Sequence, residues 1–312
     1  MKLVSILIPV RNAERWVAQA IESALAQTWP FKEVIVVDDG STDRSLEIIK
    51  GFGSAIHCEA GEHRGGNVAR NRLLELSRGE WLQYLDADDY LLPDKVARQM
   101  SFIEDHPETD IAYGPVWMEY VDGSDVHRQL LPIPKPHDPW TLLARWYLPQ
   151  TGAPLWRKQA VLDVGGWKDN QPCCQEHELY LRLLMREKQF SYCDTHGAVY
   201  RQWSESTVCK RDKPEVNRRR LEIEAQAEAF LQSRRELTPS RLQAINQTRF
   251  EIARTTWHRE PALSMEIVKA IHLSQPHFVP AGDAAPWKYR VIYRIAGFRA
   301  AEGLAQTVRP HF

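Results

Sequence analysis

The sequence lacks several features that would define its class at once. No apolar run reaches membrane-spanning length, and a strand-like segment follows the first residues directly, without a cleavable leader pattern. Neither a Walker A motif nor G-x-G-x-x-G follows the first strand, which argues against phosphate-loop ATPases and dinucleotide enzymes. The cysteines show no C-x-x-C spacing and are Cys58, Cys173, Cys174, Cys193 and Cys209. An odd set with an adjacent pair favours reduced thiols in a cytoplasmic protein over disulfides or a zinc site.

The composition is that of a globular protein, with 43% hydrophobic and 26% charged residues among 312. It excludes disordered, collagen-like and coiled-coil chains, and the length allows one large domain or two modest ones. The net charge of -1 averages two unlike parts. Residues 211–312 carry 17 basic and 11 acidic residues, whereas residues 1–210 carry 23 and 30. A basic tail fits anionic lipid, nucleic acid or simply solvated helices.

Strand and helix patterns alternate through the first hundred residues. Strand-like runs are found at 4–10, 33–37, 55–58 and 81–85, and helical spacing at 14–27, 67–76 and 93–104, with a further helix carrying Leu46 and Ile49. Such alternation predicts an α/β fold with a mostly parallel, Rossmann-like sheet.

The pattern changes after residue 111. We expect a hairpin turning at 122–124, an irregular Pro-rich stretch at 131–139, helices at 140–146 and 176–188, and short strands at 191–193 and 198–201. Beyond about residue 211 the apolar spacing is helical only. The sequence therefore predicts a domain at 1–210 and an all-helical C-terminal extension at 211–312.

Acidic clusters follow two of the predicted strands. They are Asp38-Asp39 and Asp86-Ala87-Asp88-Asp89. Ligands of open α/β sheets bind beyond the carboxyl ends of the strands, so both clusters should line one cleft. Carboxylates gathered there repel one another unless a cation intervenes, and Mn²⁺ or Mg²⁺ prefers such oxygen ligands. The alternative is that both clusters are only helix caps and turns.

A glycine pair opens the helix at 67–76. Gly65-Gly66 offers backbone N–H groups at a helix N-terminus, and Arg70 adds a guanidinium, both suited to phosphate. An ordinary loop-to-helix junction would look the same.

Four of these segments together resemble a known family. They are Ser5-Ile6-Leu7-Ile8-Pro9-Val10-Arg11-Asn12, Val34 to Asp43 with Asp38-Asp39-Gly40-Ser41, Ala69-Arg70-Asn71, and Leu85-Asp86-Ala87-Asp88-Asp89. Their order and spacing resemble inverting family-two glycosyltransferases with the A-type, nucleotide-diphospho-sugar transferase fold, over roughly residues 1–205.

The resemblance implies roles for the donor site. Pro9 would lie beside the base, and Asp39, next to Asp38, would accept from the base N3–H. Asp86-Ala87-Asp88 would be the D-x-D motif, in which Asp86 and Asp88 form the metal site. Asp88 would be the direct ligand, and Asp86 would face the ribose or sugar.

Inversion needs a general base, since the acceptor hydroxyl loses its proton as it attacks. By the resemblance Glu176 takes that position, with Gln175 in place of the usual neighbouring acid. The alternative is a polar helix start favoured by the macrodipole. His177 could be a base, a ligand or a surface residue.

The family's last strand is often followed by a histidine, and here Trp203 stands in its place. Arg201 just before it is either a phosphate contact or a surface strand residue. Trp156 and Trp203 could line an acceptor subsite near residues 151–154, although most tryptophans are core residues.

The last helical segment, 287–305, is amphipathic. Its apolar row is Trp287, Val291, Ile295 and Phe298, among Lys288, Arg290, Arg294 and Arg299. Such a helix lies on an anionic membrane, or packs on the catalytic domain or on another subunit of a homo-oligomer. No recognition motif for nucleic acid accompanies the charge, so we expect no nucleic acid partner.

We therefore predict a metal-dependent inverting glycosyltransferase that uses a nucleotide-diphosphate sugar, with a UDP-sugar favoured. The acceptor would be a hydroxyl of a glycan or lipid-linked glycan. We expect the protein to be cytoplasmic, or peripheral at the cytoplasmic face of the membrane. Two alternatives remain, a non-catalytic nucleotide-sugar-binding or scaffold protein of the same fold, and a sugar nucleotidyltransferase. The latter class carries a Gly-rich loop after the first strand, where this sequence has Pro9-Val10-Arg11-Asn12.

Overall fold

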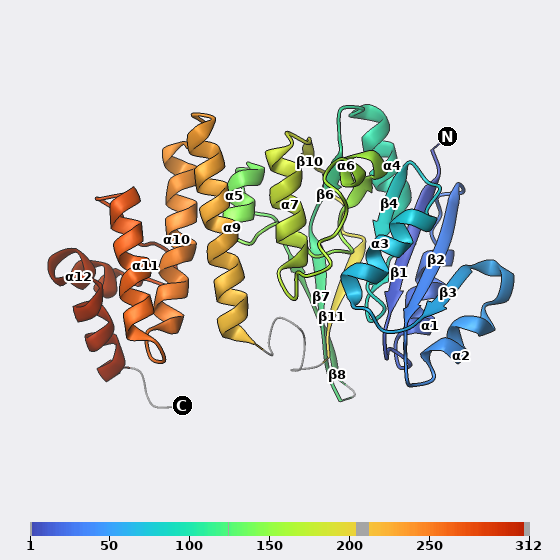
Figure 1. Ribbon diagram of the computed structural model, residues 1–312, viewed down its shortest axis with the longest axis horizontal. Coiled ribbons are helices and arrows are strands. Elements are labelled where there is room, and N and C mark those ends of the chain that lie inside the picture. Colours follow the sequence, from blue (N-terminus) through green and yellow to red (C-terminus); the bar gives the residue numbers. More distant parts are fainter. Residues whose placement is uncertain (1, 124, 204–211, 309–312) are drawn as a thin grey trace. The chain divides into compact units, whose positions relative to one another are not determined.

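The computed structural model describes residues 2–123, 125–203 and 212–308. The chain forms two compact units, and Figure 1 follows their elements along the sequence. The α/β unit comprises Met1–Pro139 and Trp146–Lys213, and the helical unit comprises Trp140–Arg145 and Pro214–Phe312. Cys209 lies outside the described residues.

A seven-stranded sheet forms the centre of the α/β unit, in the order β10-β6-β9-β4-β1-β2-β3. The strands are β1 (Val4–Val10), β2 (Lys32–Asp39), β3 (His57–Gly61), β4 (Trp81–Tyr84), β6 (Ile111–Tyr113), β9 (Leu155–Arg157) and β10 (Phe190–Tyr192). Strand β1 pairs in parallel with both β2 and β4. The carboxyl ends of these three strands therefore meet at one edge of the sheet, and the predicted mostly parallel α/β sheet is present.

Apolar residues fix this central part of the sheet. β1 and β2 are runs of β-branched and aliphatic residues, as expected for strands that are covered on both faces. Helix α1 (Val17–Leu25) buries Val17, Ala20, Ile21 and Ala24 in one core cluster with Ile6 and Ile8. The i, i+3, i+4, i+7 spacing of these residues is the reason that α1 packs by one face.

A four-stranded sheet, in the order β5-β11-β7-β8, completes the unit. Its strands are β5 (Tyr90–Leu91), β7 (Val116–Asp122), β8 (Asp125–Leu131) and β11 (Ala198–Gln202). The predicted hairpin is the antiparallel β7–β8 pair, and β11 runs parallel to β7. The further helices of the unit are α2 (Ser45–Gly51), α3 (Gly66–Leu76), α4 (Lys95–Asp105), α6 (Lys158–Asp163) and α7 (Gln175–Met185), with a 3-10 turn at Gly53–Ala55.

The helical unit consists of α5 (Pro139–Ala144), α9 (Lys213–Ser233), α10 (Pro239–Thr256), α11 (Pro261–Ser274) and α12 (Trp287–Val308). Helix α10 begins at a side-chain cap, because the Thr238 hydroxyl accepts from the Arg241 N–H and Pro239 needs no donor there. The ring of Phe250 packs edge-on against Tyr289, Tyr293 and Phe298 at the centre of the unit. None of the described helices is long and apolar enough to cross a lipid bilayer.

Helix α12 is not the single continuous helix that the sequence predicted. Gly297 has φ 78° and ψ 179°, and the helix axis changes direction there, as the dark red segment in Figure 1 shows. The glycine permits this conformation because it has no side chain. Trp287, Val291 and Ile295 therefore lie on an exposed face, whereas Phe298, beyond the break, is buried.

Candidate functional site

A cleft of about 910 Å³ lies at the carboxyl ends of β1, β2 and β4 in the α/β unit. Among the residues that the sequence singled out, its lining includes Pro9, Asp39, Arg70, Asp86, Ala87, Asp88, Glu176 and Trp203. They come from segments up to about two hundred positions apart in the sequence. These residues are therefore collected in one cavity large enough for a small organic ligand, whereas the predicted site residue Asp38 does not line it.

Asp39 lines this cleft and is held by the loop that leads into α3. Its Oδ1 accepts from the backbone N–H of Arg64 at 2.7 Å, and its Oδ2 lies 2.8 Å from His63 Nδ1. The Gly65 N–H donates to Oδ2 at 3.0 Å. Backbone donors thus fix the carboxylate in place and leave it at the wall of the cleft.

Gly40 makes this arrangement sterically feasible. Its φ is +70°, and a Cβ there would lie 2.6 Å from the His63 backbone nitrogen. Both the left-handed conformation and the close approach of the loop exclude a larger residue.

We expect Gly40→Ala to lower the free energy of unfolding by about 1–3 kcal/mol, through backbone strain and displacement of the loop at His63. Chemical denaturation measures the change. The matched control is Gly51→Ala, since a Cβ at Gly51 meets no atom within 4 Å. Equal stability of the two variants would show that the loop is not held against Gly40.

Asp38 is not brought to the cleft surface. The residue is buried, and its Oδ1 accepts from the Ser41 N–H at 3.0 Å, so it closes the turn after β2. Pro9, at the end of β1, does line the cleft. The alternative that these acids only form turns therefore holds for Asp38, whereas Asp39 lines the cavity.

The second acidic segment follows β4 directly. Asp86 Oδ1 accepts from Arg70 Nη2 at 2.7 Å, and Asp88 Oδ2 accepts from the Trp203 indole N–H at 2.9 Å. Burial and the neighbouring Asp86 carboxylate raise the pKa of Asp88. The charged form of Asp88 is therefore held at a cost that a nearby cation would relieve.

Arg201 is neither a surface residue nor free for phosphate. It is 3% exposed, and its guanidinium donates to Glu119 Oε1, the Asp88 carbonyl and Gln19 Oε1. Its backbone N–H donates to Asp89, whose pKa burial and the neighbouring acids raise well above the usual range. Arg201 thus holds the backbone of the acidic segment through its hydrogen bond to the Asp88 carbonyl. The interpretation of Arg201 as a surface strand residue is wrong, because the side chain is buried.

Glu176 lies in the first turn of α7 and lines the cleft. The Thr151 hydroxyl donates to its Oε1, and among the described residues no donor is seen at Oε2. Glu178, two residues further along α7, is buried, and its Oε2 lies 2.7 Å from Arg182 Nη2 in an ion pair. Of the two acids that open α7, only Glu176 is therefore placed to meet a ligand.

Aromatic residues form the other walls of the cleft. Trp146 stacks on His177 with ring centroids 3.8 Å apart, and both line the cavity, so His177 is not a surface residue. Trp156 is fully buried and stacks on Tyr180 at 5.2 Å, so the subsite expected there is not formed by Trp156. Sequence reasoning gave Trp146 no role, because no motif marks it, and it named Thr151 only as part of the segment 151–154 near an expected acceptor subsite.

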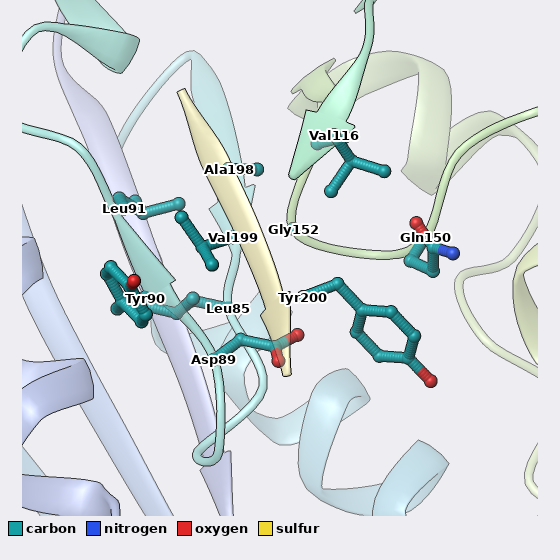
Figure 2. A pocket seen from close by; sticks show the side chains of 11 residues that line it. Leu85, Asp89, Tyr90, Leu91, Val116, Gln150, Gly152, Ala198, Val199 and Tyr200 are labelled. Atoms are coloured by element: carbon teal, nitrogen blue, oxygen red, sulfur yellow. The ribbon is translucent and has the colours of Figure 1, made fainter. Parts of the chain in front are cut away.

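A separate gap lies next to the cleft, and Figure 2 shows the residues around it. Leu85, Leu91, Val116 and Val199 make it largely apolar, and it has no room for a water molecule. The side chain of Tyr200 points away from the gap in Figure 2 and also lines the larger cleft. Of these two, the larger cavity is therefore the one with room for a ligand.

The acidic segment is compatible with a divalent cation of the magnesium type. No group of three or more ligand side chains is found in the part of the chain that the structure describes. Magnesium and manganese sites in phosphate-transfer enzymes often use only one or two carboxylates, with phosphate and water as the other ligands. Asp86 and Asp88, with the raised pKa of Asp88, suit that donor set.

Comparison with known proteins agrees with this geometry. Residues 5–162 match the family model described as glycosyl transferase family 2. A UDP-Glc:alpha-D-GlcNAc-diphosphoundecaprenol beta-1,3-glucosyltransferase of Escherichia coli is 38% identical over 106 residues, which are 33% of this chain and 42% of that protein. The chain spans less than half the length of the curated relatives it matches.

Solved structures share the fold. TarS 1–349 of S. aureus, in complex with UDP-GlcNAc, superposes with a TM-score of 0.66 at 16% identity, over 99% of this chain and 93% of that one. A mannosyltransferase of Pyrobaculum calidifontis, in complex with GDP-Man and Mn2+, gives 0.55 at 15% identity, over 98% and 79%. The predicted A-type fold with additional C-terminal helices is confirmed. Because the family model matches half of its residues, the chain belongs to glycosyl transferase family 2.

Proposed function

We propose that the protein transfers a sugar from a nucleotide-diphosphate donor, with a UDP-sugar favoured, to a hydroxyl acceptor with inversion at the anomeric carbon. The observation that carries the proposal is the convergence of Asp39, Asp86, Asp88 and Glu176 on one cleft. The UDP-glucose donor in the name of the Escherichia coli relative and the UDP-GlcNAc bound to TarS support the choice of nucleotide. We assign the reaction to residues 1–210 and regard 211–312 as a helical extension.

Donor binding would use separate groups of the cleft for the base and for the phosphates. The fixed Asp39 carboxylate is an acceptor for a base N–H, and Pro9 beside it gives the base an apolar edge. Arg70, already paired with Asp86 at 2.7 Å, supplies positive charge near the phosphates. These residues would orient the donor across the ends of β1, β2 and β4.

Asp88 would bind Mn²⁺ or Mg²⁺, with Asp86 beside it toward the ribose or sugar. A bound cation would offset the charge that develops on the departing diphosphate. The protein's own part is to hold the two carboxylates, Asp86 through Arg70 and Asp88 through Trp203.

Glu176 would be the general base. Oε1 is held by the Thr151 hydroxyl, so Oε2 can take the proton of the acceptor hydroxyl as its oxygen attacks the anomeric carbon. Trp146, stacked on His177 in the same cavity, offers a flat apolar ring against which a sugar face can pack. The acceptor would be a glycan or a lipid-linked glycan, and a lipid-linked acceptor would bring the chain to a membrane surface.

A panel of nucleotide sugars, each with and without Mn²⁺, tests the function. We expect one donor to raise the melting temperature only when the metal is present, and to be consumed when an acceptor is added. A donor concentration of 100 times its Kd should add about 2.7 kcal/mol to the free energy of unfolding. Binding without transfer or hydrolysis would favour the non-catalytic binder, and the absence of binding by every donor would overturn the proposal.

A further inference from the structure

The first half of α12 carries an exposed apolar row, which we define as Trp287, Val291 and Ile295. Their exposed fractions are 65%, 47% and 82%. At about 100° per residue they lie within roughly a quarter of the helix circumference. Large apolar side chains gathered on one face of a helix mark a surface that meets something less polar than water.

The opposite face of the same helix is fixed in the core of the helical unit. Tyr289 and Tyr293 are buried against Phe250, and their hydroxyls bond to Glu302 Oε1 at 2.8 Å and His272 Nε2 at 2.9 Å. Within the unit the helix cannot rotate the row inward without breaking these contacts. The exposure of the row is therefore a property of the folded unit.

Positive charge flanks the row on both sides. Lys288 follows Trp287 on one border, while Arg290 and Arg294 lie on the other, and all three are exposed. No ion pair involving them is found among the described residues, and the sequence has no acidic residue from 284 to 301. A cationic border around an exposed tryptophan and two aliphatic residues complements an anionic, interfacial surface.

We propose that this row lies in the headgroup region of an anionic lipid bilayer, with the three cations facing the lipid phosphates. Each basic residue near an anionic bilayer strengthens binding severalfold, and tryptophan is favoured at that depth. The helix segment that carries the row, residues 287–295, is only about 13 Å long. The area that such a short row can bury is far smaller than the area that a specific protein interface buries. The charge and the size of the row both favour lipid over a second protein.

Flotation of the full chain with vesicles tests the proposal. We expect binding to vesicles with roughly one third phosphatidylglycerol, little binding to phosphatidylcholine alone, and release by salt. Ile295→Glu should weaken binding about tenfold or more, because it places a carboxylate in the row. The charge-matched control is Val126→Glu on β8, where Val126 is 58% exposed in the α/β unit.

Three results would overturn the lipid assignment. They are failure of the wild-type chain to bind anionic vesicles at low salt, equal binding by wild type and Ile295→Glu, and an oligomer that Ile295→Glu dissociates in size-exclusion chromatography with light scattering. Donor-induced thermal shifts are measured on the same variants. Because the row lies outside the cleft, loss of vesicle binding with an unchanged shift separates this proposal from the proposed function.

Discussion

Glu176→Gln should lower turnover by about 100- to 10,000-fold while leaving donor affinity within a few-fold of wild type. Glutamine keeps an oxygen that can accept the hydrogen bond of the Thr151 hydroxyl, so the start of α7 retains its contacts. What is lost is the carboxylate that we propose takes the acceptor proton. Single-turnover transfer and donor titration, measured separately, check the two halves of the expectation.

The control is Glu104→Gln, an exposed acid on α4 outside the cleft. A Glu176→Gln variant with full turnover would remove Glu176 from the role of general base. Thr151→Val provides a second check, since loss of the hydroxyl should lower turnover less than loss of the carboxylate.

Local patterns predicted the parts of the fold that depend on continuous sequence. The parallel strands β1, β2 and β4 are apolar runs directly followed by polar turns, so their positions and the acidic ends were visible. The adjacent residues Asp38 and Asp39 nevertheless have different surroundings, because successive side chains of a strand point to opposite faces. Asp39 faces the cleft, and Asp38 is buried in the turn.

Features that depend on distant segments could not be predicted in this way. β9 has only three residues and is antiparallel between β4 and β6, so neither its length nor its neighbours leave a local signal. Its central residue Trp156 is buried by Tyr84 and Tyr180, which are far away in sequence. The buried position of Arg201 likewise depends on its hydrogen bond to Glu119, and the residues of its own strand give no sign of it.

The row on α12 is a case in which a local pattern predicted too much. Helical spacing placed Phe298 with Trp287, Val291 and Ile295, because a periodicity count assumes an unbroken helix. Gly297 breaks the helix, and Phe298 then packs at 5.5 Å and nearly perpendicular to Trp257. The non-helical backbone conformation of one residue, Gly297, thus separates an exposed row from a core residue.

Asp88→Asn should abolish metal-dependent donor binding and lower transfer by about 1,000-fold or more, which corresponds to about 4 kcal/mol. The asparagine oxygen can still accept from the Trp203 indole, at the position where Asp88 Oδ2 lies 2.9 Å from that nitrogen. The shape of the segment after β4 is therefore kept, while the charge that a hard cation needs is removed. Mn²⁺ affinity and the donor-induced thermal shift, with and without metal, measure the loss directly.

Trp203 allows the charge of Asp88 to be separated from its orientation. Trp203→Phe keeps an aromatic ring near Trp16, whose ring centroid lies 6.0 Å from that of Trp203, but removes the indole donor. Asp88 then stays charged and loses a fixed partner, so Mn²⁺ affinity should change far less than in Asp88→Asn. Asp105→Asn, an exposed acid on α4, controls for the change in net charge. If Asp88→Asn bound Mn²⁺ and donor as wild type does, the metal site would have to lie elsewhere in the cleft, and the assignment of Asp86 and Asp88 would fail.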